Sequence, residues 1–508
     1  MFASVPAAML FGARGHPVAV EVHVGKGMPG FHVVGLPDES VREARDRVRA
    51  AVMSSGATWP DTKITVNLAP SQERKSGSGL DLAIAVGVLA ASEQVPLDSL
   101  ATLAFLGEVG LDGSIRSIPG VAPMAGVLRE LDLVVPVGNA SEAWVVASRR
   151  VHPVGHLRDL IAVLGHDAPW PEHDGPPAPV IDPPGPDLAD VVGQPMARTA
   201  LEIAAAGRHH LLFVGPPGSG KTMLAARLVS ILPELSPDAS LEVTMVHSAA
   251  GLALPPSGLV VRPPYRAPHH TSSEVSMVGG GSHSLRPGEA SLAHHGVLFL
   301  DELPEFASRV MDTLRQPLED GAVRVSRAAL HTTIPARFQL VAAMNPCPCG
   351  EGNAPGECEC GDARVRKYIG RVSGPLLDRF DLRVGVERPT VDHLLGSERG
   401  ESSVAVALRV AAARARADQR QGCVNADLSS IELDRHAPLD AGALAVLRFE
   451  LEKGRLSARG YHRIRRVART IADLGPAVVD SIDEATVSLA LEMRSSVRRH
   501  ATADGRVA

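Results

Sequence analysis

The sequence predicts an α/β protein whose central domain carries a parallel sheet with helices on both faces. Short apolar runs at 211–214, 297–300 and 339–343 have the length and composition of buried parallel strands, and helical patterns separate them. A glycine-rich turn directly follows the first of these runs. A proline-rich segment at 169–186 divides the chain, because so many prolines suit neither a helix nor a central strand.

Length and composition set the expected domain organisation. A chain of 508 residues is too long for one hydrophobic core. We expect an α+β domain, a Pro-rich linker, the parallel-sheet domain and a C-terminal helical domain. Their predicted bounds are residues 1–165, 166–187, 188–389 and 390–508; the last boundary lies where a strand-like sequence gives way to an alanine-rich, helical one.

Charge and hydropathy exclude several functional classes. The net charge of −6 excludes a uniformly basic, histone-like protein, so any nucleic-acid site has to be a local patch. No apolar run approaches 18 residues, and no cationic region precedes the first apolar stretch. Five cysteines in so long a chain do not indicate a secreted disulfide framework. We therefore expect a cytoplasmic protein that does not contact a membrane.

Hydrophobic periodicity predicts the elements of the N-terminal domain. Residues 17–23 and 63–68 read as strands. Residues 40–53 are amphipathic and predict a helix with Ser40 as its N-cap. Residues 80–91 predict a buried helix. This mixture of strands and helices indicates an α+β domain.

A phosphate-binding loop is predicted between the strand at 211–214 and a helix over 223–232. The loop fits the pattern G-x-x-x-x-G-K-T through Gly215, Pro216, Pro217, Gly218, Ser219, Gly220, Lys221 and Thr222. Glycines let backbone N–H groups converge on a phosphate, and the start of a helix favours an anion. Lys221 adds a positive charge and Thr222 offers a hydroxyl to Mg²⁺. ATP and Mg²⁺ are the expected ligands.

Polar residues follow the neighbouring strands. Asp301 and Glu302 come directly after GVLFL, at the carboxyl end of a strand, where ligands bind in such sheets. Asp301 is expected to hold Mg²⁺ through water, and Glu302 to polarise the attacking water. Asn345 ends the third strand and is expected to orient this water. Arg379 is suited to stabilising γ-phosphate charge, although the adjacent aspartates make a surface ion pair a slightly better explanation from the residues alone.

Several segments together resemble a known family, the magnesium-chelatase-like AAA+ ATPases of the ComM (YifB) family. In the second and third domains these are GVLFLDELPEF, NPCPCG, GPLLDRFD and LSARGYHRIRRVARTIADL, together with the phosphate-binding loop. In the first domain they are FHVVGLPDESVREARDRVRAA and VNLAPSQERKSGSGLDLAIAV. The resemblance therefore covers nearly the whole chain outside the linker.

The resemblance implies an AAA+ core followed by a helical lid, and a homo-hexamer that hydrolyses ATP between subunits. It also implies a DNA helicase that promotes branch migration during integration of transforming DNA. Arg379 then resembles the arginine finger that reaches a neighbour's ATP, and Arg459 resembles the sensor 2 arginine. Arg463 is the second candidate for sensor 2, because the helix presents both on nearly one face.

Two inserts in the core resemble the pore loops of related DNA helicases. Residues 272–287 contain three consecutive glycines, which suit a mobile loop. Residues 321–337 alternate as a hairpin, with Arg324 and Arg327 near its tip as candidate DNA-binding residues. Phosphate contacts there would give sequence-independent affinity that falls with salt. The alternative is a hairpin that serves only as a structural flap.

The N-terminal domain resembles the proteolytic domain of Lon proteases, which use a Ser–Lys dyad. The match runs through KSGSGLD at 75–81 and GEVGLDGSIRSIPG at 107–120. Gly79 occupies the nucleophile position and Ala122 the general-base position, and neither can perform acyl transfer. We therefore expect a protease fold without protease activity. A shifted dyad through Lys75 is the alternative.

Four cysteines form a compact group, Cys347, Cys349, Cys358 and Cys360. Four thiolates within fourteen residues suit tetrahedral Zn²⁺, although the Cys-x-Cys spacing is tighter than usual. The polar, glycine-rich loop between the pairs would need a metal to order it. Adjacent histidines at 269–270 and 294–295 are expected to point to different sides of an element, which disfavours chelation of one ion.

The sequence thus predicts a hexameric, ATP-driven DNA motor acting in recombination or in integration of transforming DNA. Its expected partners are single-stranded or branched DNA and recombination proteins. Scarce aromatic residues favour tracking of the DNA backbone over base stacking. Two alternatives remain: the ATPase subunit of a magnesium chelatase, and an ATP-switched scaffold or chaperone without translocation.

Overall fold

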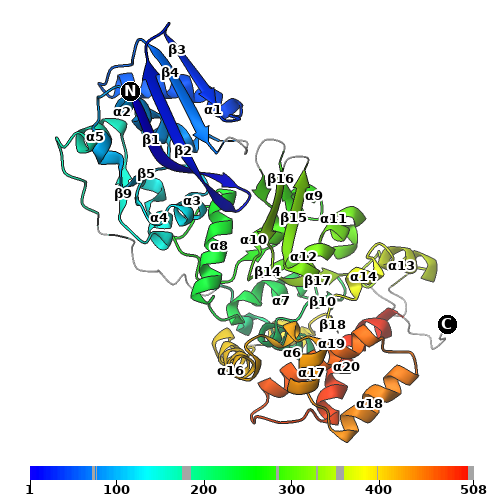
Figure 1. Cartoon of the computed structure of the whole chain (residues 1–508). Helices are drawn as coiled ribbons and strands as arrows, with labels where there is room; N and C mark the ends of the chain where they lie inside the picture. The colour runs from blue at the N-terminus through cyan, green and yellow to red at the C-terminus, as the bar shows by residue number, and fades with distance from the viewer. Residues whose placement is uncertain are drawn as a thin grey trace.

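The computed structural model describes most of the 508 residues. Outside the description lie residues 71–74, 76, 174, 176–184, 282–284, 328–329, 351–357, 359, 397–398 and 502–508, and the side chains of 326–327, 330–331, 393–394 and 495–501. Figure 1 shows an N-terminal lobe (blue to cyan), a central lobe (green) and a C-terminal helical lobe (orange to red) in succession. Among the described residues, no helix is both long and apolar enough to cross a membrane.

The N-terminal lobe begins with a four-stranded sheet in the order β1-β2-β4-β3. Its strands are β1 (Phe2–Phe11), β2 (Arg14–Gly25), β3 (Gly30–Val34) and β4 (Lys63–Ala69), all antiparallel except the β3–β4 pair. The helices α1 (Glu39–Ser54) and α2 (Asp81–Ala91) share a core with this sheet. Every residue of α2 is buried, as its continuous apolar sequence predicts. Both predicted strands and both predicted helices are therefore present.

The N-cap of α1 differs from the prediction. Asp38, not Ser40, has the extended backbone of a cap, and its side chain accepts a hydrogen bond from the backbone N–H of Val41. A carboxylate at this position also interacts favourably with the positive end of the helix dipole. The helix therefore starts one residue earlier than its apolar periodicity suggests.

A second, parallel sheet completes this lobe. It has the order β5-β8-β9, formed by β5 (Leu103–Phe105), β8 (Asp132–Pro136) and β9 (Val151–Val154). A two-strand ladder and three helices accompany it: β6 (Glu108–Val109), β7 (Ile115–Arg116), α3 (Val121–Val127), α4 (Ala140–Val146) and α5 (Leu157–Leu164).

The central lobe is a parallel five-stranded sheet in the order β11-β14-β17-β10-β18. Its strands are β10 (Leu211–Val214), β11 (Tyr265–Arg266), β14 (Val297–Leu300), β17 (Gln339–Met344) and β18 (Leu382–Gly385). Leu211 and Phe213 enter one hydrophobic core, whereas Leu212 and Val214 enter another on the opposite face. Helices thus cover both faces, and the three predicted strands of the doubly wound sheet are confirmed.

Helices and inserts surround this sheet. The helices are α6 (Pro195–Gly207), α7 (Lys221–Arg227), α8 (Pro237–Ala250), α10 (Glu289–Leu292), α11 (Ser308–Thr313), α12 (Arg315–Asp320), α13 (Asp362–Ile369) and α14 (Gly374–Leu377). The helix predicted over 223–232 is instead α7 followed by a 3₁₀ turn over Val229–Ile231. The first insert holds α9 (Glu274–Val278) and a short ladder of β12 (Gly279–Gly280) with β13 (Arg286–Pro287). The second is the hairpin of β15 (Ala322–Arg327) and β16 (Leu330–Pro335), as predicted.

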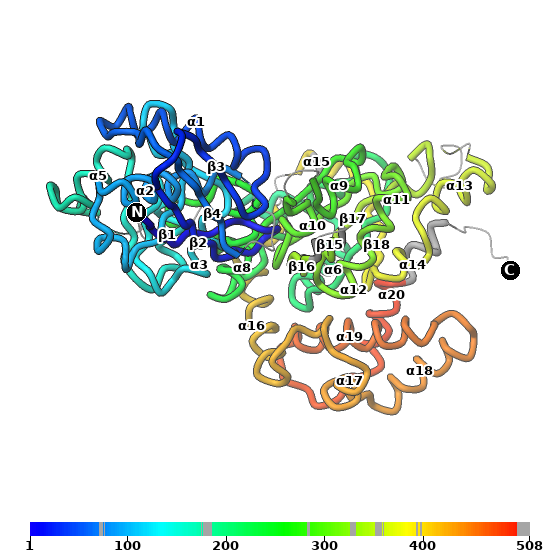
Figure 2. Tube along the Cα trace, turned by 45° about the horizontal axis from the view of Figure 1, so that its top comes forward, coloured from blue at the N-terminus to red at the C-terminus, as the bar shows by residue number. Residues whose placement is uncertain are grey.

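The C-terminal lobe is helical. It follows α15 (Val391–Leu395) and contains α16 (Ser403–Gln421), α17 (Ser430–His436), α18 (Ala441–Glu452), α19 (Ala458–Leu474) and α20 (Glu484–Ala501). Helices α16 and α19 pack on α6, and α20 packs on β18. One hydrophobic core is therefore continuous between the lid helices and one face of the parallel sheet, although Figure 2 shows the lid as a projecting lobe.

The N-terminal lobe docks on α8 of the central lobe. Glu142 accepts hydrogen bonds from the Ser248 hydroxyl and from the backbone N–H of Ala122, and the backbone N–H of Gly120 donates to the Ser248 carbonyl at 2.9 Å. Ala13, at the β1–β2 turn, joins a small apolar cluster with Ile334 of the second insert. The first hairpin of the chain thus contacts the base of a predicted pore loop (Figures 1 and 2).

Candidate functional site

The phosphate-binding loop links β10 to α7, as the sequence predicts. Gly218 and Gly220 have φ angles of +74° and +89°, in the left-handed region that favours glycine. A Cβ on Gly215 would lie 2.0 Å from the carbonyl oxygen of Val386, so no side chain fits there. These three glycines are therefore required by the backbone, independently of any ligand.

Lys221 is folded back over the loop. Its ammonium donates to the carbonyl oxygens of Gly215 and Pro216, both at 2.8 Å, and to Oδ1 of Asn345 at 3.2 Å. Burial lowers the pKa of Lys221, while the charges of Asp301 and Glu302 act in the opposite direction. The lysine is thus held by neutral acceptors, which an anionic phosphate can replace with a stronger, charge-assisted bond.

The predicted magnesium ligands lie side by side. Thr222 Oγ1 donates to Asp301 Oδ2 at 2.7 Å. Because β14, β17 and β10 are neighbours in one parallel sheet, their carboxyl ends bring Asp301, Asn345 and the phosphate-binding loop to the same edge. A hydroxyl and a carboxylate at this distance suit Mg²⁺, which prefers oxygen ligands and keeps several waters.

Glu302 has a left-handed backbone, with φ at +51°. This uncommon conformation for a non-glycine residue is typical of functional sites that the surrounding structure over-determines. Its carboxylate lies 3.4 Å from Nδ1 of His270. His270 is a site residue that the sequence pattern does not identify, because it lies more than thirty residues before Glu302 in the chain.

Arg379 lies near the amino-terminal ends of the strands, whereas the phosphate-binding loop lies at their carboxyl ends. It forms an ion pair with Glu319 and lines a cleft of about 240 Å³. Other lining residues, such as His210 and Phe338, immediately precede β10 and β17. The phosphate-binding loop follows the carboxyl end of β10, so the length of the strand, about 10 Å, separates the two sites. Arg379 is therefore not part of this chain's own phosphate site.

The two sensor 2 candidates accompany Arg379. Arg463 donates to the Arg379 carbonyl at 3.0 Å and to Asp381 Oδ1 at 2.5 Å, so it is committed to the fold. Arg459 is exposed on the same helix. Burial lowers the pKa of Arg379, and the nearby charges of Arg463, Arg459 and Arg315 lower it further. Several arginines thus line the cleft, and Glu319 partly neutralises the charge of Arg379.

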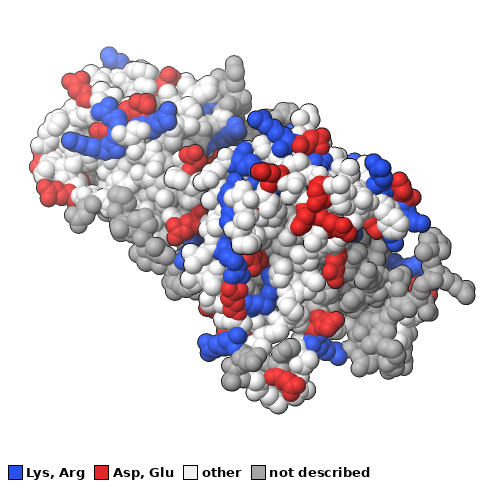
Figure 3. All heavy atoms as spheres, turned by 90° about the horizontal axis from the view of Figure 1, so that it is seen from below, with Lys and Arg blue, Asp and Glu red and all other residues white. Residues whose placement is uncertain are grey.

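The hairpin of β15 and β16 carries the predicted DNA-binding residues. Arg324 is 63% exposed and lies 3.2 Å from Asp320 at the end of α12. The backbone of Arg327 pairs with Leu330 next to the tip, but its side chain lies outside the described residues. Figure 3 shows basic and acidic side chains interspersed over one face of the molecule. This face is therefore not uniformly basic.

The four predicted zinc ligands converge. The Cys347 sulfur lies 3.2 Å from that of Cys349 and 3.6 Å from that of Cys358, and all four sulfurs, including that of Cys360, lie within 4.8 Å of one another. Tetrahedral Zn²⁺ with four Zn–S bonds of about 2.3 Å places its sulfurs about 3.8 Å apart, whereas a disulfide requires about 2.0 Å. The donor set therefore fits zinc and does not fit a disulfide.

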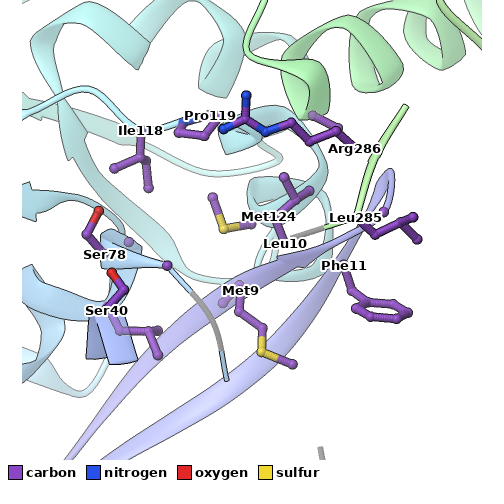
Figure 4. A pocket seen from close by; sticks show the side chains of 16 residues that line it. Met9, Leu10, Phe11, Ser40, Ser78, Ile118, Pro119, Met124, Leu285 and Arg286 are labelled. Atoms are coloured by element: carbon purple, nitrogen blue, oxygen red, sulfur yellow. The ribbon is translucent and has the colours of Figure 1, made fainter. Parts of the chain in front are cut away.

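A cavity of about 350 Å³ occupies the position of the resembled protease centre (Figure 4). Gly79 and the hydroxyl-bearing Ser40 and Ser78 line it, but no lysine does among the described lining residues. Ser78 donates to Glu108, and the buried Lys75 donates to the Pro70 carbonyl. Gly79 and Ala122 cannot form the original dyad, and among the described residues Ser78 donates to Glu108 rather than pairing with Lys75.

One histidine pair behaves differently from the prediction. His294 and His295 both reach Oε2 of Glu242, through Nε2 at 2.8 and 2.9 Å. His295 has a φ of +55°, an uncommon conformation for a non-glycine residue. His294 Nδ1 accepts from the backbone N–H of Arg337, so its proton is on Nε2 and points to Glu242. This tautomer leaves Nε2 without a lone pair for a metal ion.

Comparison with known families gives matches over most of the chain. The family described as "Magnesium chelatase, subunit ChlI" matches residues 187–394, "Subunit ChlI of Mg-chelatase" matches 20–139, and "Magnesium chelatase, subunit ChlI C-terminal" matches 400–494. The ranges 20–139 and 400–494 lie inside the first and last predicted domains, whereas 187–394 extends past both predicted bounds of the core.

Curated relatives match at full length. The competence protein ComM of Haemophilus influenzae is 43% identical over 470 residues, which is 91% of this chain and 92% of ComM. The uncharacterised YifB protein of Escherichia coli is 43% identical over 91% of both chains. An uncharacterised protein of Mycobacterium tuberculosis is 44% identical over 96% of this chain and 98% of its own. In contrast, the magnesium-chelatase 67 kDa subunit of Chlorobaculum tepidum is 29% identical over only 31% of this chain.

Proposed function

The chain belongs to the ComM (YifB) family of magnesium-chelatase-like AAA+ ATPases, and from this premise we propose that it is an ATP-driven DNA motor. It assembles as a homo-hexamer in the cytoplasm and hydrolyses ATP at each subunit interface. One observation carries this proposal most strongly. The phosphate-binding loop lies at the carboxyl ends of the strands and Arg379 at their amino-terminal ends, so an arginine finger has to come from a neighbouring subunit.

The residues at and beside the phosphate-binding loop have separate roles in ATP hydrolysis. Lys221 exchanges its carbonyl acceptors for phosphate oxygens. Thr222 and Asp301 would hold Mg²⁺, which would neutralise phosphate charge. Glu302 polarises the attacking water and Asn345 orients it. These roles are proposed from position: Lys221 and Thr222 begin α7, and Asp301, Glu302 and Asn345 follow the carboxyl ends of β14 and β17.

Arg379 and Arg459 act on the neighbour's nucleotide. The charge of Arg459 is close enough to Arg379 to lower the pKa of Arg379. A delocalised guanidinium suits the charge that develops on the γ-phosphate. Arg463 is paired with Asp381 and donates a hydrogen bond to the Arg379 carbonyl. It therefore positions Arg379 rather than contacting nucleotide.

DNA passes over the hairpin of β15 and β16. Arg324 presents an exposed guanidinium, which suits contact with a phosphate, and Arg327 follows near the tip. The relative named a competence protein supports a setting in integration of transforming DNA or in recombination, with recombination proteins as further partners. Zn²⁺ at the four cysteines orders the loop that follows Asn345, and the N-terminal lobe serves as a brace without proteolytic activity.

Two alternatives retain the same ATP site. A magnesium-chelatase ATPase subunit is favoured by the family descriptions, but the chelatase relative covers only a third of this chain. An ATP-switched scaffold or chaperone would use the site without translocation. Salt-sensitive binding of DNA and coupling of hydrolysis to DNA separate the motor from both.

Unwinding of a forked or three-stranded DNA tests the proposal, with wild type compared with Glu302→Gln at two salt concentrations. We expect the wild type to unwind DNA with ATP, and the variant to bind DNA and stall, with hydrolysis reduced about 100-fold or more. If the wild type neither binds DNA nor shows DNA-stimulated hydrolysis, the motor is wrong and the alternatives take its place.

A further inference from the structure

Two consecutive acidic residues end α12, and each holds a different arginine. Glu319 forms the ion pair with Arg379, the proposed finger. Asp320 pairs with Arg324, the proposed DNA contact, at 3.2 Å. Gly321 follows with a φ of +66° and leads directly into β15. One helix end thus connects the residue that reaches a neighbour's ATP with the hairpin that reaches DNA.

The Glu319–Arg379 pair differs from the other ion pairs of the same cleft. Arg208 is held by both carboxylate oxygens of Asp427 at 2.7 Å, and Arg463 is held by the buried Asp381. Glu319 is 53% exposed and Arg379 is 25% exposed. A half-exposed ion pair is weak and exchanges readily, whereas the pair of Arg463 with the buried Asp381 does not.

The hairpin can influence this weak pair through its connection to α12. The backbone N–H of Gly321 donates to the Pro317 carbonyl, and the backbone N–H of Ala336, at the far end of the hairpin, donates to the Gly321 carbonyl. Both strands of the hairpin are therefore tied to the last turn of α12. When DNA phosphates replace Asp320 as the partner of Arg324, the hairpin is expected to shift. Such a shift would displace the turn of α12 that carries Glu319.

We propose that Glu319 is a positioning residue that holds Arg379 away from the neighbour's γ-phosphate until DNA occupies the hairpin. This inference rests on the proposed function, because it needs hydrolysis at a subunit interface. Without DNA, the Glu319 carboxylate competes with phosphate for the guanidinium, and hydrolysis is slow. With DNA, the end of α12 moves, the ion pair opens and Arg379 becomes available. Glu319 thereby makes hydrolysis dependent on DNA without touching nucleotide.

The test is the rate of ATP hydrolysis by the full chain, with and without forked DNA. Glu319→Gln removes the charge and keeps the shape of the side chain. We expect its rate without DNA to rise about three- to fivefold, the range that a half-exposed ion pair can supply, and its stimulation by DNA to fall by the same factor. The double variant Glu319→Gln/Arg379→Ala should lose this gain, because the released group is Arg379.

Asp427→Asn provides a matched control. It removes one negative charge from the same cleft but releases Arg208 rather than Arg379. Its rates should stay close to those of the wild type. The inference is overturned if Glu319→Gln behaves like Asp427→Asn, or if Glu319→Gln hydrolyses ATP more slowly than the wild type. If instead the wild type shows no hydrolysis, or Arg379→Ala matches it, the proposed function itself fails.

Discussion

At the scale of single residues, hydrogen bonds link the phosphate-binding loop and the start of α7 to the residues that follow β14 and β17. The roles assigned to Lys221, Thr222 and Asp301 follow from residue types and their spacing, and the structure pairs Thr222 with Asp301 and Lys221 with Asn345. The proximity of His270 to Glu302 depends on how a distant loop folds back, which no local pattern encodes. Likewise, no local pattern encodes the convergence of His294 and His295 on Glu242.

His294 gives a prediction for the dependence of stability on pH. Burial lowers its pKa to about 4, and the neighbouring His295 adds to this effect. The unfolded chain, with a histidine pKa near 6.5, therefore binds more protons than the folded chain between about pH 6.5 and 4. The stabilising contribution of neutral His294 is complete above pH 6.5 and is lost as the pH falls, by about 2 kcal/mol at pH 5.

The measurement is chemical unfolding of wild type and His294→Asn at pH 7 and pH 5. The asparagine oxygen can still accept from the backbone N–H of Arg337 but carries no titrating group. We expect the variant to be less stable than the wild type at pH 7, with the difference shrinking at pH 5. An equal difference at both pH values would show that His294 does not titrate in this way.

At the scale of elements, strands and the phosphate-binding loop were predictable, because apolar runs and glycine spacing are local signals. The helix after the loop was predicted at 223–232 but ends at Arg227, since side-chain periodicity does not register a change to a 3₁₀ turn. The cap at Asp38 was missed because a serine two residues later satisfies the same preference. The two-residue strand β11 carries too little sequence to be recognised.

The hairpin of β15 and β16 yields a prediction about DNA binding. Arg324→Ala should weaken binding to single-stranded and forked DNA of any sequence, and should reduce the slope of log affinity against log salt by about one per protomer engaged. Titrations at several salt concentrations measure both quantities. Arg45→Ala, which removes an exposed arginine from the N-terminal lobe, should change neither. Equal effects of the two variants would contradict a specific role for the hairpin.

The four-cysteine loop yields a prediction about metal content. Purified protein should carry about one Zn²⁺ per chain, and Cys358→Ser should carry much less, because a tetrahedral site loses a ligand. Elemental analysis measures the metal directly. Cys423→Ser is the control, since Cys423 lies outside the cluster and should leave the zinc content unchanged. Full zinc content in Cys358→Ser would contradict the four-thiolate site.

At the scale of the whole molecule, the resemblance predicted the succession of an inactive protease-like lobe, an AAA+ core and a lid. It could not predict how the lobes contact one another. The interface between Glu142 and Ser248 joins residues more than a hundred positions apart, and its hydrogen bonds exist only after both lobes have folded. The placement of Arg379 and the phosphate-binding loop at opposite ends of the strands is also a property of the assembled sheet.

Because the two sites lie at opposite ends of the strands, subunit complementation tests most directly whether neighbouring subunits share each hydrolysis site. Lys221→Ala lacks a working phosphate site but keeps the finger, and Arg379→Ala lacks the finger but keeps the phosphate site. DNA-stimulated ATP hydrolysis is measured for each variant and for an equimolar mixture assembled together. Each variant alone should be nearly inactive. In the mixture, a competent interface needs the finger of one variant and the loop of the other, so about a quarter of the wild-type rate should return. A mixture as inactive as its components, or an active Arg379→Ala, would contradict hydrolysis shared between subunits.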